Sequence, residues 1–144
     1  RLARCKRSLA VLADEAERLG ITIAVECLPR TCLGHTSEEM RELVEADDRL
    51  GICCDVNHLL KESPESFIRK LGRRIVTVHM SDYDGVDERH WLPGQGIIRW
   101  NEVIRALAEH GYAGPFLYEV RRPDPYELAS CWRGLLADYG RAYG

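Results

Sequence analysis

Four residues that can bind a divalent metal each stand at the end of an apolar run that is typical of a β-strand. They are Glu26 after residues 21–25, Asp55 after 50–54, His79 after 75–78 and Glu119 after 115–118. A buried carboxylate is costly unless it is paired or bound to a metal, so a single one at a strand end can be accidental. Four at the same place in four successive units indicate one shared metal site.

Three carboxylates and one imidazole form an oxygen-rich set of ligands. Such a set favours Mn²⁺ or Mg²⁺ over a thiolate-type zinc site, and it also accommodates Co²⁺ or Zn²⁺. A divalent cation stabilises the negative charge that develops when a C–H proton beside a carbonyl group is removed. Glu26 and Glu119, on the first and last strands of the set, can then move protons on opposite sides of a substrate, each contributing about 10²- to 10⁴-fold to the rate.

The segments that must position these residues carry helical patterns. Apolar residues spaced by three and four predict one buried stripe on a first helix, which Gly20 ends. The stripe consists of Leu2, Cys5, Leu9, Leu12, Ala16 and Leu19. Thr36, with Glu39 three residues later, predicts the capping box of a second helix, and Ser63-Pro64 predicts the start of a third. Further helices are indicated over residues 103–107 and 128–139.

Helices that alternate with short, continuous apolar strands predict a parallel sheet covered by helices. Two α/β architectures fit this order: an open doubly wound sheet, or about four strands that form half of a (β/α)₈ TIM barrel. The segments after the strand ends, 27–36, 56–63 and 80–99, are long and polar, whereas the links from helix to strand are short. Long loops on the C-terminal face are typical of barrel enzymes, so we predict the half-barrel.

Length and composition indicate one domain over residues 1–144, with 45% hydrophobic and 30% charged residues. A net charge of -3 provides no general attraction to nucleic acid or to anionic membranes. No apolar run approaches the roughly 18 residues of a membrane span, and no signal peptide is evident, so we expect a cytoplasmic protein. The six cysteines form no C-x-x-C pair, which indicates reduced thiols rather than a disulfide framework or zinc knuckle.

Five short motifs connect these elements to a known family. They are 25–26 (Val-Glu), 55–58 (Asp-Val-Asn-His), 78–82 (Val-His-Met-Ser-Asp), 90–100 (His-Trp-Leu-Pro-Gly-Gln-Gly-Ile-Ile-Arg-Trp) and 118–120 (Tyr-Glu-Val). In this order and spacing, over roughly residues 9–120, they resemble the C-terminal half of the xylose-isomerase-like barrels. They are most similar to the sugar phosphate isomerase/epimerase group, and AP endonucleases of the same fold are more distant relatives.

The resemblance implies a divalent-metal-dependent isomerase or epimerase of a sugar, a sugar phosphate or a related ketone, which works by proton transfer through an enediolate. It implies that the four strand-end residues are the metal ligands and that Glu26 and Glu119 are also the acid/base pair. His58 matches a position that contacts substrate oxygen in the epimerases and binds metal in the endonucleases. His90 matches an endonuclease metal ligand, and sugar-acting members often carry a polar residue there.

Two arginines complete the comparison. Arg30, four residues after Glu26, matches a residue that helps to shape the epimerase pocket, so we expect Arg30, His58 and His90 to bind substrate. Arg99 stands where the family commonly has an aspartate that caps the following helix. The departure weakens the helix cap more than it weakens the chemistry.

Two other functions compete with the isomerase. AP-endonuclease-like phosphodiester hydrolysis would use His58 and His90 to extend the site towards a multi-zinc cluster, but the net acidity counts against a nucleic-acid partner. A barrel remnant without catalytic activity is the second. Dehydration of an inosose-type ketone has the same first step as isomerisation, so the sequence does not separate an isomerase from such a lyase.

The expected half-barrel needs a second half. A complete barrel of this kind has about 250 residues and eight strands. We expect either an N-terminal half-barrel or a homodimer partner to complete it, and we favour the first because the chain begins inside a predicted helix and the family has four units upstream. The expected ligand is a small-molecule carbohydrate.

Other candidate features have simpler interpretations. A plain turn is a better interpretation of the segment 94–96 (Gly-Gln-Gly) than a phosphate cradle. His35 and His110 are expected to have no chemical role. A group of basic residues is expected to form a solvated helix end on the face away from the site. These residues are Arg69, Lys70, Arg73 and Arg74.

Overall fold

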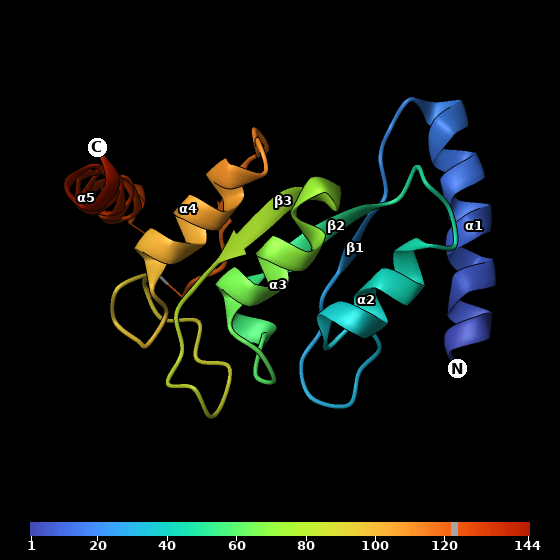
Figure 1. Cartoon of the computed structure of the whole chain (residues 1–144), viewed down its shortest axis with the longest axis horizontal. Helices are drawn as coiled ribbons and strands as arrows, with labels where there is room; N and C mark the ends of the chain where they lie inside the picture. Colours follow the sequence, from blue (N-terminus) through green and yellow to red (C-terminus); the bar gives the residue numbers. More distant parts are fainter. Residues whose placement is uncertain (122–123) are drawn as a thin grey trace.

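The computed structural model describes residues 1–121 and 124–144, and its centre is a parallel sheet of four strands (Figure 1). The strands are β1 (Ala24–Glu26), β2 (Gly51–Asp55), β3 (Ile75–Met80) and β4 (Phe116–Tyr118). They lie in the order β1-β2-β3-β4, and every neighbouring pair is parallel. All four strands therefore end at the same edge of the sheet, as predicted.

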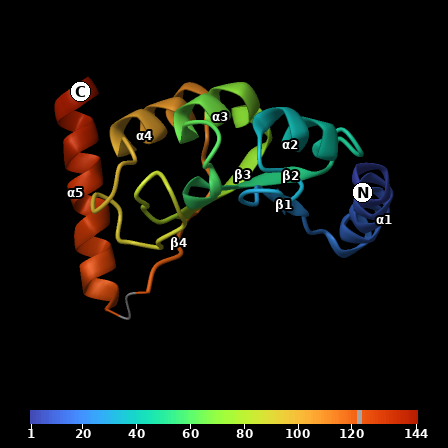
Figure 2. The same cartoon turned by 90° about the horizontal axis from the view of Figure 1, so that it is seen from below.

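The described residues form five α-helices, which lie along one face and at the two ends of the sheet (Figure 2). They are α1 (Leu2–Leu19), α2 (Ser37–Val44), α3 (Pro64–Leu71), α4 (Trp100–Glu109) and α5 (Pro125–Tyr143), with short 3₁₀ helices at Val56–His58 and Gly72–Arg74. Figure 2 shows α2, α3 and α4 along one face of the sheet, with α1 at one end and α5 at the other. Among the described residues, no helix is long and apolar enough to span a membrane.

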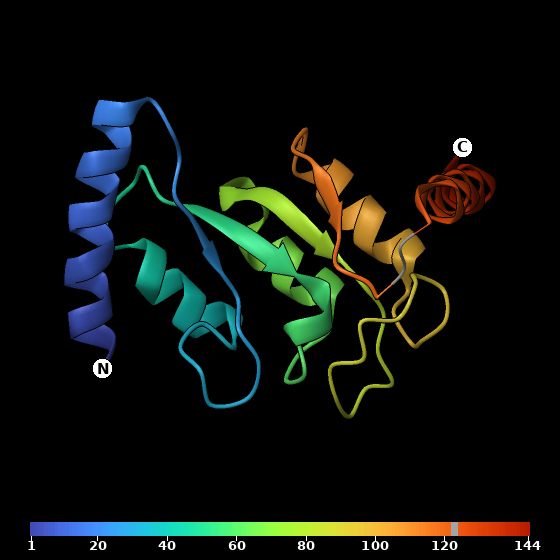
Figure 3. The same cartoon turned by 180° about the vertical axis from the view of Figure 1, so that it is seen from behind.

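The hydrophobic core lies between the sheet and α2, α3 and α4. Outward-facing strand residues are fully buried against apolar side chains of the three helices: Ile52, Cys54, Val78 and Met80 from the strands, and Met40, Phe67, Ile68 and Val103 from the helices. On the other face, Val76 is 39% and Leu117 is 55% exposed. None of the described helices lies over this open face (Figure 3). The chain thus forms a half-barrel whose interior side is uncovered.

The predicted helix ends are confirmed. Thr36 Oγ1 accepts a hydrogen bond of 3.3 Å from the Glu39 N–H, and Ser63 caps α3 with Pro64 at the first helical position. The Glu39 carboxylate accepts instead from the Gly34 N–H at 2.8 Å, so it does not return to Thr36 as in a standard capping box. Gly20 ends α1 with a φ of 69°, a left-handed conformation that glycine adopts at little cost.

The apolar stripe predicted for α1 is partly wrong. Leu9 and Ala16 are buried, together with Ala13, which the prediction omitted. Leu12 and Leu19 are instead 47% and 72% exposed. The reason is the position of α1 at the end of the sheet, where α2 covers only one side of the helix.

The basic cluster around the end of α3 is exposed at Arg69, Lys70 and Arg73, as predicted, but Arg74 is half-buried. The Arg74 guanidinium donates hydrogen bonds of 3.0 Å to the carbonyls of Val44 and Asp47 and of 2.7 Å to that of Leu50. These carbonyls lie at or after the end of α2, where the helix leaves acceptors without intrahelical donors. Lys70 binds Glu62 at 2.9 Å. The cluster therefore fastens α3 to its neighbours.

Candidate metal centre

The strand register turns the four strand-end residues towards the same face of the sheet. Asp55 on β2 is opposite His79 on β3. Glu26 on β1 is opposite Cys53, which lies two residues before Asp55 and so points to the same face as Asp55.

The Glu119 side chain points to the same face, because β4 pairs with the other edge of β3 and side chains alternate along it. Leu117 is opposite His79, and Glu119 follows two residues later. The Glu119 N–H donates to the Met80 carbonyl at 3.0 Å, so the strand pairing continues one residue beyond β4. Alternation of side chains along a strand thus directs all four residues to the open face.

The four side chains converge on a small volume. One potential ligand atom from each of Glu26, Asp55, His79 and Glu119 lies within 4.8 Å of all the others. His79 Nδ1 is 3.1 Å from Glu119 Oε2, 3.5 Å from Glu26 Oε1 and 3.7 Å from Asp55 Oδ2. Residues that are more than 90 positions apart in the chain therefore form one cluster of three carboxylates around an imidazole.

Exposure within the cluster follows the order of the strands. The side chains from the central strands are the less exposed, at 0% for Asp55 and 20% for His79. Those from the outer strands are more exposed, at 35% for Glu26 and 43% for Glu119. The central pair is thus suited to anchoring an ion, and the outer pair is accessible to a bound molecule.

Three atoms of the cluster are buried without a hydrogen-bond partner in the part of the chain that the structure describes. They are Asp55 Oδ2, His79 Nδ1 and Glu119 Oε2. A buried polar atom without a partner costs about 1–3 kcal/mol, and more when it is charged. One divalent cation among the three would satisfy all of them, and carboxylates and imidazole are suitable ligands for it. The residues present therefore fit a bound divalent metal.

Burial and the short distances between the charged groups also shift the pKa values of the cluster. Burial is the largest effect on the pKa of Asp55 and raises it, but His79, Glu119, His58 and the Asn57 N–H together outweigh burial, so the pKa is lowered. Asp55 in turn raises the pKa of His79 to about 9, against the opposing effect of burial. Burial and the nearby Asp55 carboxylate raise the pKa of Glu119. Without a metal, the cluster thus retains a proton that partly offsets the repulsion between its carboxylates.

The structure brings His58 and His90 to the border of this cluster. His58 Nδ1 donates to the Cys27 carbonyl at 3.0 Å and lies 3.4 Å from Asp55 Oδ2. His90 Nδ1 donates to the Glu119 carbonyl at 3.0 Å. The two imidazole rings lie edge to face, with their centroids 6.3 Å apart. In each neutral ring the remaining nitrogen, Nε2, is then a hydrogen-bond acceptor.

Arg30 does not join the cluster. It lies in the loop after β1, is exposed, and forms ion pairs with Asp87 and Glu88 in the loop after β3. These pairs connect two of the loops on the C-terminal edge. The interaction of Arg30 with substrate therefore stays a prediction.

Sequence reasoning missed Asp82, which organises the loop after β3. The buried Asp82 carboxylate accepts hydrogen bonds from the Gly94 N–H at 2.8 Å, the Ile98 N–H at 3.1 Å and Trp100 Nε1 at 3.1 Å. The Gly94 N–H thus donates to a carboxylate of the chain itself, and the Gln95 N–H donates to the Leu92 carbonyl at 3.0 Å. The interpretation of this segment as a turn fits these contacts better than a phosphate cradle.

Comparisons with known proteins identify the family. The family model described as "Xylose isomerase-like TIM barrel" matches residues 1–135. The chain belongs to the xylose isomerase-like TIM barrel family. Within it, the chain is similar to a ketose 3-epimerase of Arthrobacter globiformis, with 30% identity over 148 residues, covering 95% of this chain and 50% of that protein. It is also similar to an inosose isomerase of Halalkalibacterium halodurans, with 29% identity over 139 residues, covering 88% of this chain and 49% of that protein.

A solved structure supports the same family relation. The chain superimposes on a D-tagatose 3-epimerase-like protein with a TM-score of 0.88 and 29% identity, covering 99% of this chain and 57% of that one. The chain spans about half the length of the curated relatives that it matches. The predicted fold, half of a xylose isomerase-like TIM barrel, is thus confirmed.

Proposed function

We propose that the chain carries the metal centre of a divalent-metal-dependent isomerase or epimerase. The substrate class is a sugar, a sugar phosphate or a related ketone. The observation that carries this proposal is the convergence of Glu26, Asp55, His79 and Glu119 from four strand ends within 4.8 Å of one another. The similarity to a ketose 3-epimerase and an inosose isomerase supports the substrate class.

The proposed reaction begins with the removal of a C–H proton beside the substrate carbonyl. A bound divalent cation supplies Lewis-acid stabilisation of the charge that develops on the substrate oxygens. Glu26 and Glu119 belong to the two outer strands and lie on opposite sides of His79. One glutamate removes the proton and the other returns a proton to the opposite face of the enediolate. Asp55 and His79, on the central strands, hold the ion.

The cation in this proposal is Mn²⁺ or Mg²⁺, because three of the four ligands are carboxylates. Co²⁺ and Zn²⁺ also suit a set that contains an imidazole. His58 and His90 border the centre, and we assign them to hydrogen bonds with substrate oxygens. Arg30 is assigned to the substrate pocket through its place on the C-terminal loops, where its ion pairs with Asp87 and Glu88 hold it at the rim.

The geometry gives less support to phosphodiester hydrolysis. Neither His58 nor His90 belongs to a group of converging metal ligands among the described residues. An inosose-type dehydratase is compatible with the same centre, since it shares the first proton removal.

The open face of the sheet and its two free edges support a second half-barrel as partner. β1 and β4 each have one neighbouring strand in the described sheet. Exposed Val76 and Leu117 lie on the face that a closed barrel would cover. We propose that an N-terminal half-barrel, or a second copy of this chain, completes the barrel and supplies the rest of the substrate pocket.

The test is solvent deuterium exchange into a panel of ketoses by the protein loaded with Mn²⁺. Glu119→Gln removes a proposed acid/base group while keeping its size, and we expect exchange to fall by at least about 10²-fold. Glu15→Gln, on the exposed surface of α1, is the matched control and should keep full exchange. Exchange that survives Glu119→Gln would exclude this glutamate from proton transfer, and cleavage of abasic DNA would favour the nuclease.

A further inference from the structure

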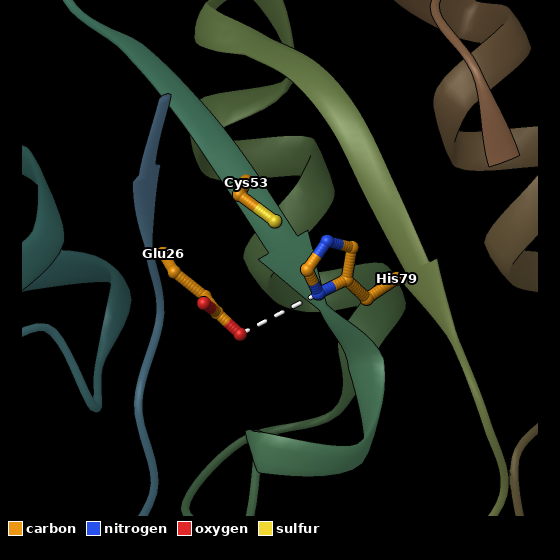
Figure 4. A group of neighbouring side chains, drawn as sticks. All are labelled: Glu26, Cys53 and His79. Atoms are coloured by element: carbon orange, nitrogen blue, oxygen red, sulfur yellow. Dashed lines mark ion pairs between the residues drawn. The ribbon is translucent and has the colours of Figure 1, made fainter. Parts of the chain in front are cut away.

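A second group of potential metal ligands shares the open face with the proposed centre. Cys53 on β2 lies two residues before Asp55 and directly opposite Glu26, so its side chain points to the same face as both. Single ligand atoms of Glu26, Cys53 and His79 lie within 4.8 Å of one another. Figure 4 shows the three side chains converging from three neighbouring strands, with the Cys53 sulfur beside the His79 imidazole.

The environment of Cys53 differs from that of the other buried thiol near the site. Cys27 Sγ donates to the Asp55 carbonyl at 3.3 Å and accepts from the Asp55 N–H at 3.1 Å. Cys53 is 4% exposed, and its sulfur forms no hydrogen bond within residues 1–121 and 124–144. Asp55, which is 0% exposed, directs its unpartnered Oδ2 towards the same His79 ring. The thiol therefore lies where buried polar atoms already lack a partner.

We propose that Cys53 is an alternative metal ligand, which allows this site to hold a soft or borderline divalent cation such as Zn²⁺, Co²⁺ or Cd²⁺ through Glu26, Cys53 and His79. The inference rests on the proposed metal-dependent function. Thiolate sulfur favours such ions, whereas carboxylate oxygens suit Mn²⁺ and Mg²⁺. The thiol proton leaves to solvent as the metal–sulfur bond forms.

The two groups compete for one ion, because Glu26 and His79 belong to both. A hard ion takes the position among the carboxylates, with Asp55 and Glu119. A soft ion takes the position at Cys53 and lies away from Glu119, one of the two proposed proton-transfer groups. We therefore expect Cd²⁺ to bind tightly without supporting turnover, whereas Mn²⁺ should support turnover.

The experiment uses Co²⁺ as a spectroscopic probe of the protein. Visible d–d bands report that the site is occupied, and a sulfur-to-cobalt charge-transfer band in the near ultraviolet reports coordination by a thiolate. We expect both in the native protein and only the d–d bands in Cys53→Ser. The substitution should weaken Zn²⁺ binding by at least about tenfold and change Mn²⁺ binding by less than about twofold. Cys54→Ala, a buried cysteine on the opposite face, should keep both spectral features.

The spectra separate this inference from the function on which it rests. Native protein with d–d bands but no charge-transfer band would overturn the role of Cys53 and leave the carboxylate centre intact. A charge-transfer band that persists in Cys53→Ser would also overturn it, since another cysteine would then be the ligand. Absence of both bands would refute the metal centre itself. A native spectrum without the charge-transfer band overturns the role of Cys53 even if a variant fails to fold.

Discussion

Metal binding to this centre should release a proton from His79. Asp55 raises the pKa of His79 to about 9 in the metal-free protein. At pH 7 the imidazole is therefore protonated, and an ion must displace that proton to bind. Each pH unit below the pKa weakens apparent binding by about tenfold, so affinity at pH 7 should be about 100-fold below its value above pH 9. The burial-raised pKa of Glu119 adds to proton release towards acidic pH.

Calorimetric titration with Mn²⁺ measures this effect directly. Experiments at pH 7 in two buffers with different ionisation enthalpies should give a release of about one proton per ion from His79. His79→Gln should bind more weakly but lose most of the pH dependence between pH 7 and 8. Affinity of the native protein that does not change over this range would refute the assignment of His79 as a protonated ligand.

The same pKa shift predicts different pH trends for the stability of the metal-free and the metal-loaded protein. A raised pKa in the folded state stabilises the metal-free protein fully below the unfolded value of 6.5, and this stabilisation is lost as the pH rises through about 9. Metal-loaded protein should instead keep a nearly constant stability over this interval, because His79 is then unprotonated both in the loaded folded state and in the unfolded chain, so the stabilisation added by the metal grows as the pH rises. Thermal melts with and without a chelator distinguish the two trends.

Two further substitutions test the scaffold, both by chemical denaturation. Arg99→Asp supplies the missing cap of α4, which should stabilise the protein by about 1 kcal/mol. The substitution also removes the ion-pair partner of Glu65, whose side chain is 5% exposed, and leaving this carboxylate unpaired should cost about 3 kcal/mol. We therefore expect the free energy of unfolding to fall by about 2 kcal/mol, and a rise would contradict this prediction. In Gly51→Ala, the new Cβ would lie 2.6 Å from the Val76 side chain, and this clash should lower the free energy of unfolding by about 1–3 kcal/mol. Gly134→Ala, with no atom within 4 Å, should be neutral or stabilising; equal effects at both glycines would refute the steric argument.

The strand ends and their side chains could be predicted from sequence because the signals are local. An apolar run followed by a polar residue gives the end of a strand, and alternation gives the face. Caps such as Thr36 and Ser63 depend on residues three or fewer positions away, and both are confirmed. Parallel pairing of successive strands then brings Glu26, Asp55 and His79 together without further information.

Features that depend on distant partners could not be predicted in this way. Asp82 binds Gly94 and Trp100, which are 12 and 18 residues away, and no spacing in the sequence connects them. Leu12 satisfies the helical pattern but is exposed, because its burial depends on what packs beside α1. Cys53 could have been found, since it lies on the same face as Asp55, but as one of six cysteines it carried no distinguishing pattern.

The order of the strands divides the proposed centre into two kinds of ligand. Asp55 and His79 belong to central strands, and hydrogen bonds on both sides fix these strands within this chain. Glu26 and Glu119 belong to the outer strands, each with a described neighbour on one side. A second half-barrel would therefore change the solvation of the two glutamates far more than that of Asp55 or His79. In the proposed enzyme, metal affinity would then be mainly a property of this half, whereas the rate of proton transfer would depend on what completes the barrel.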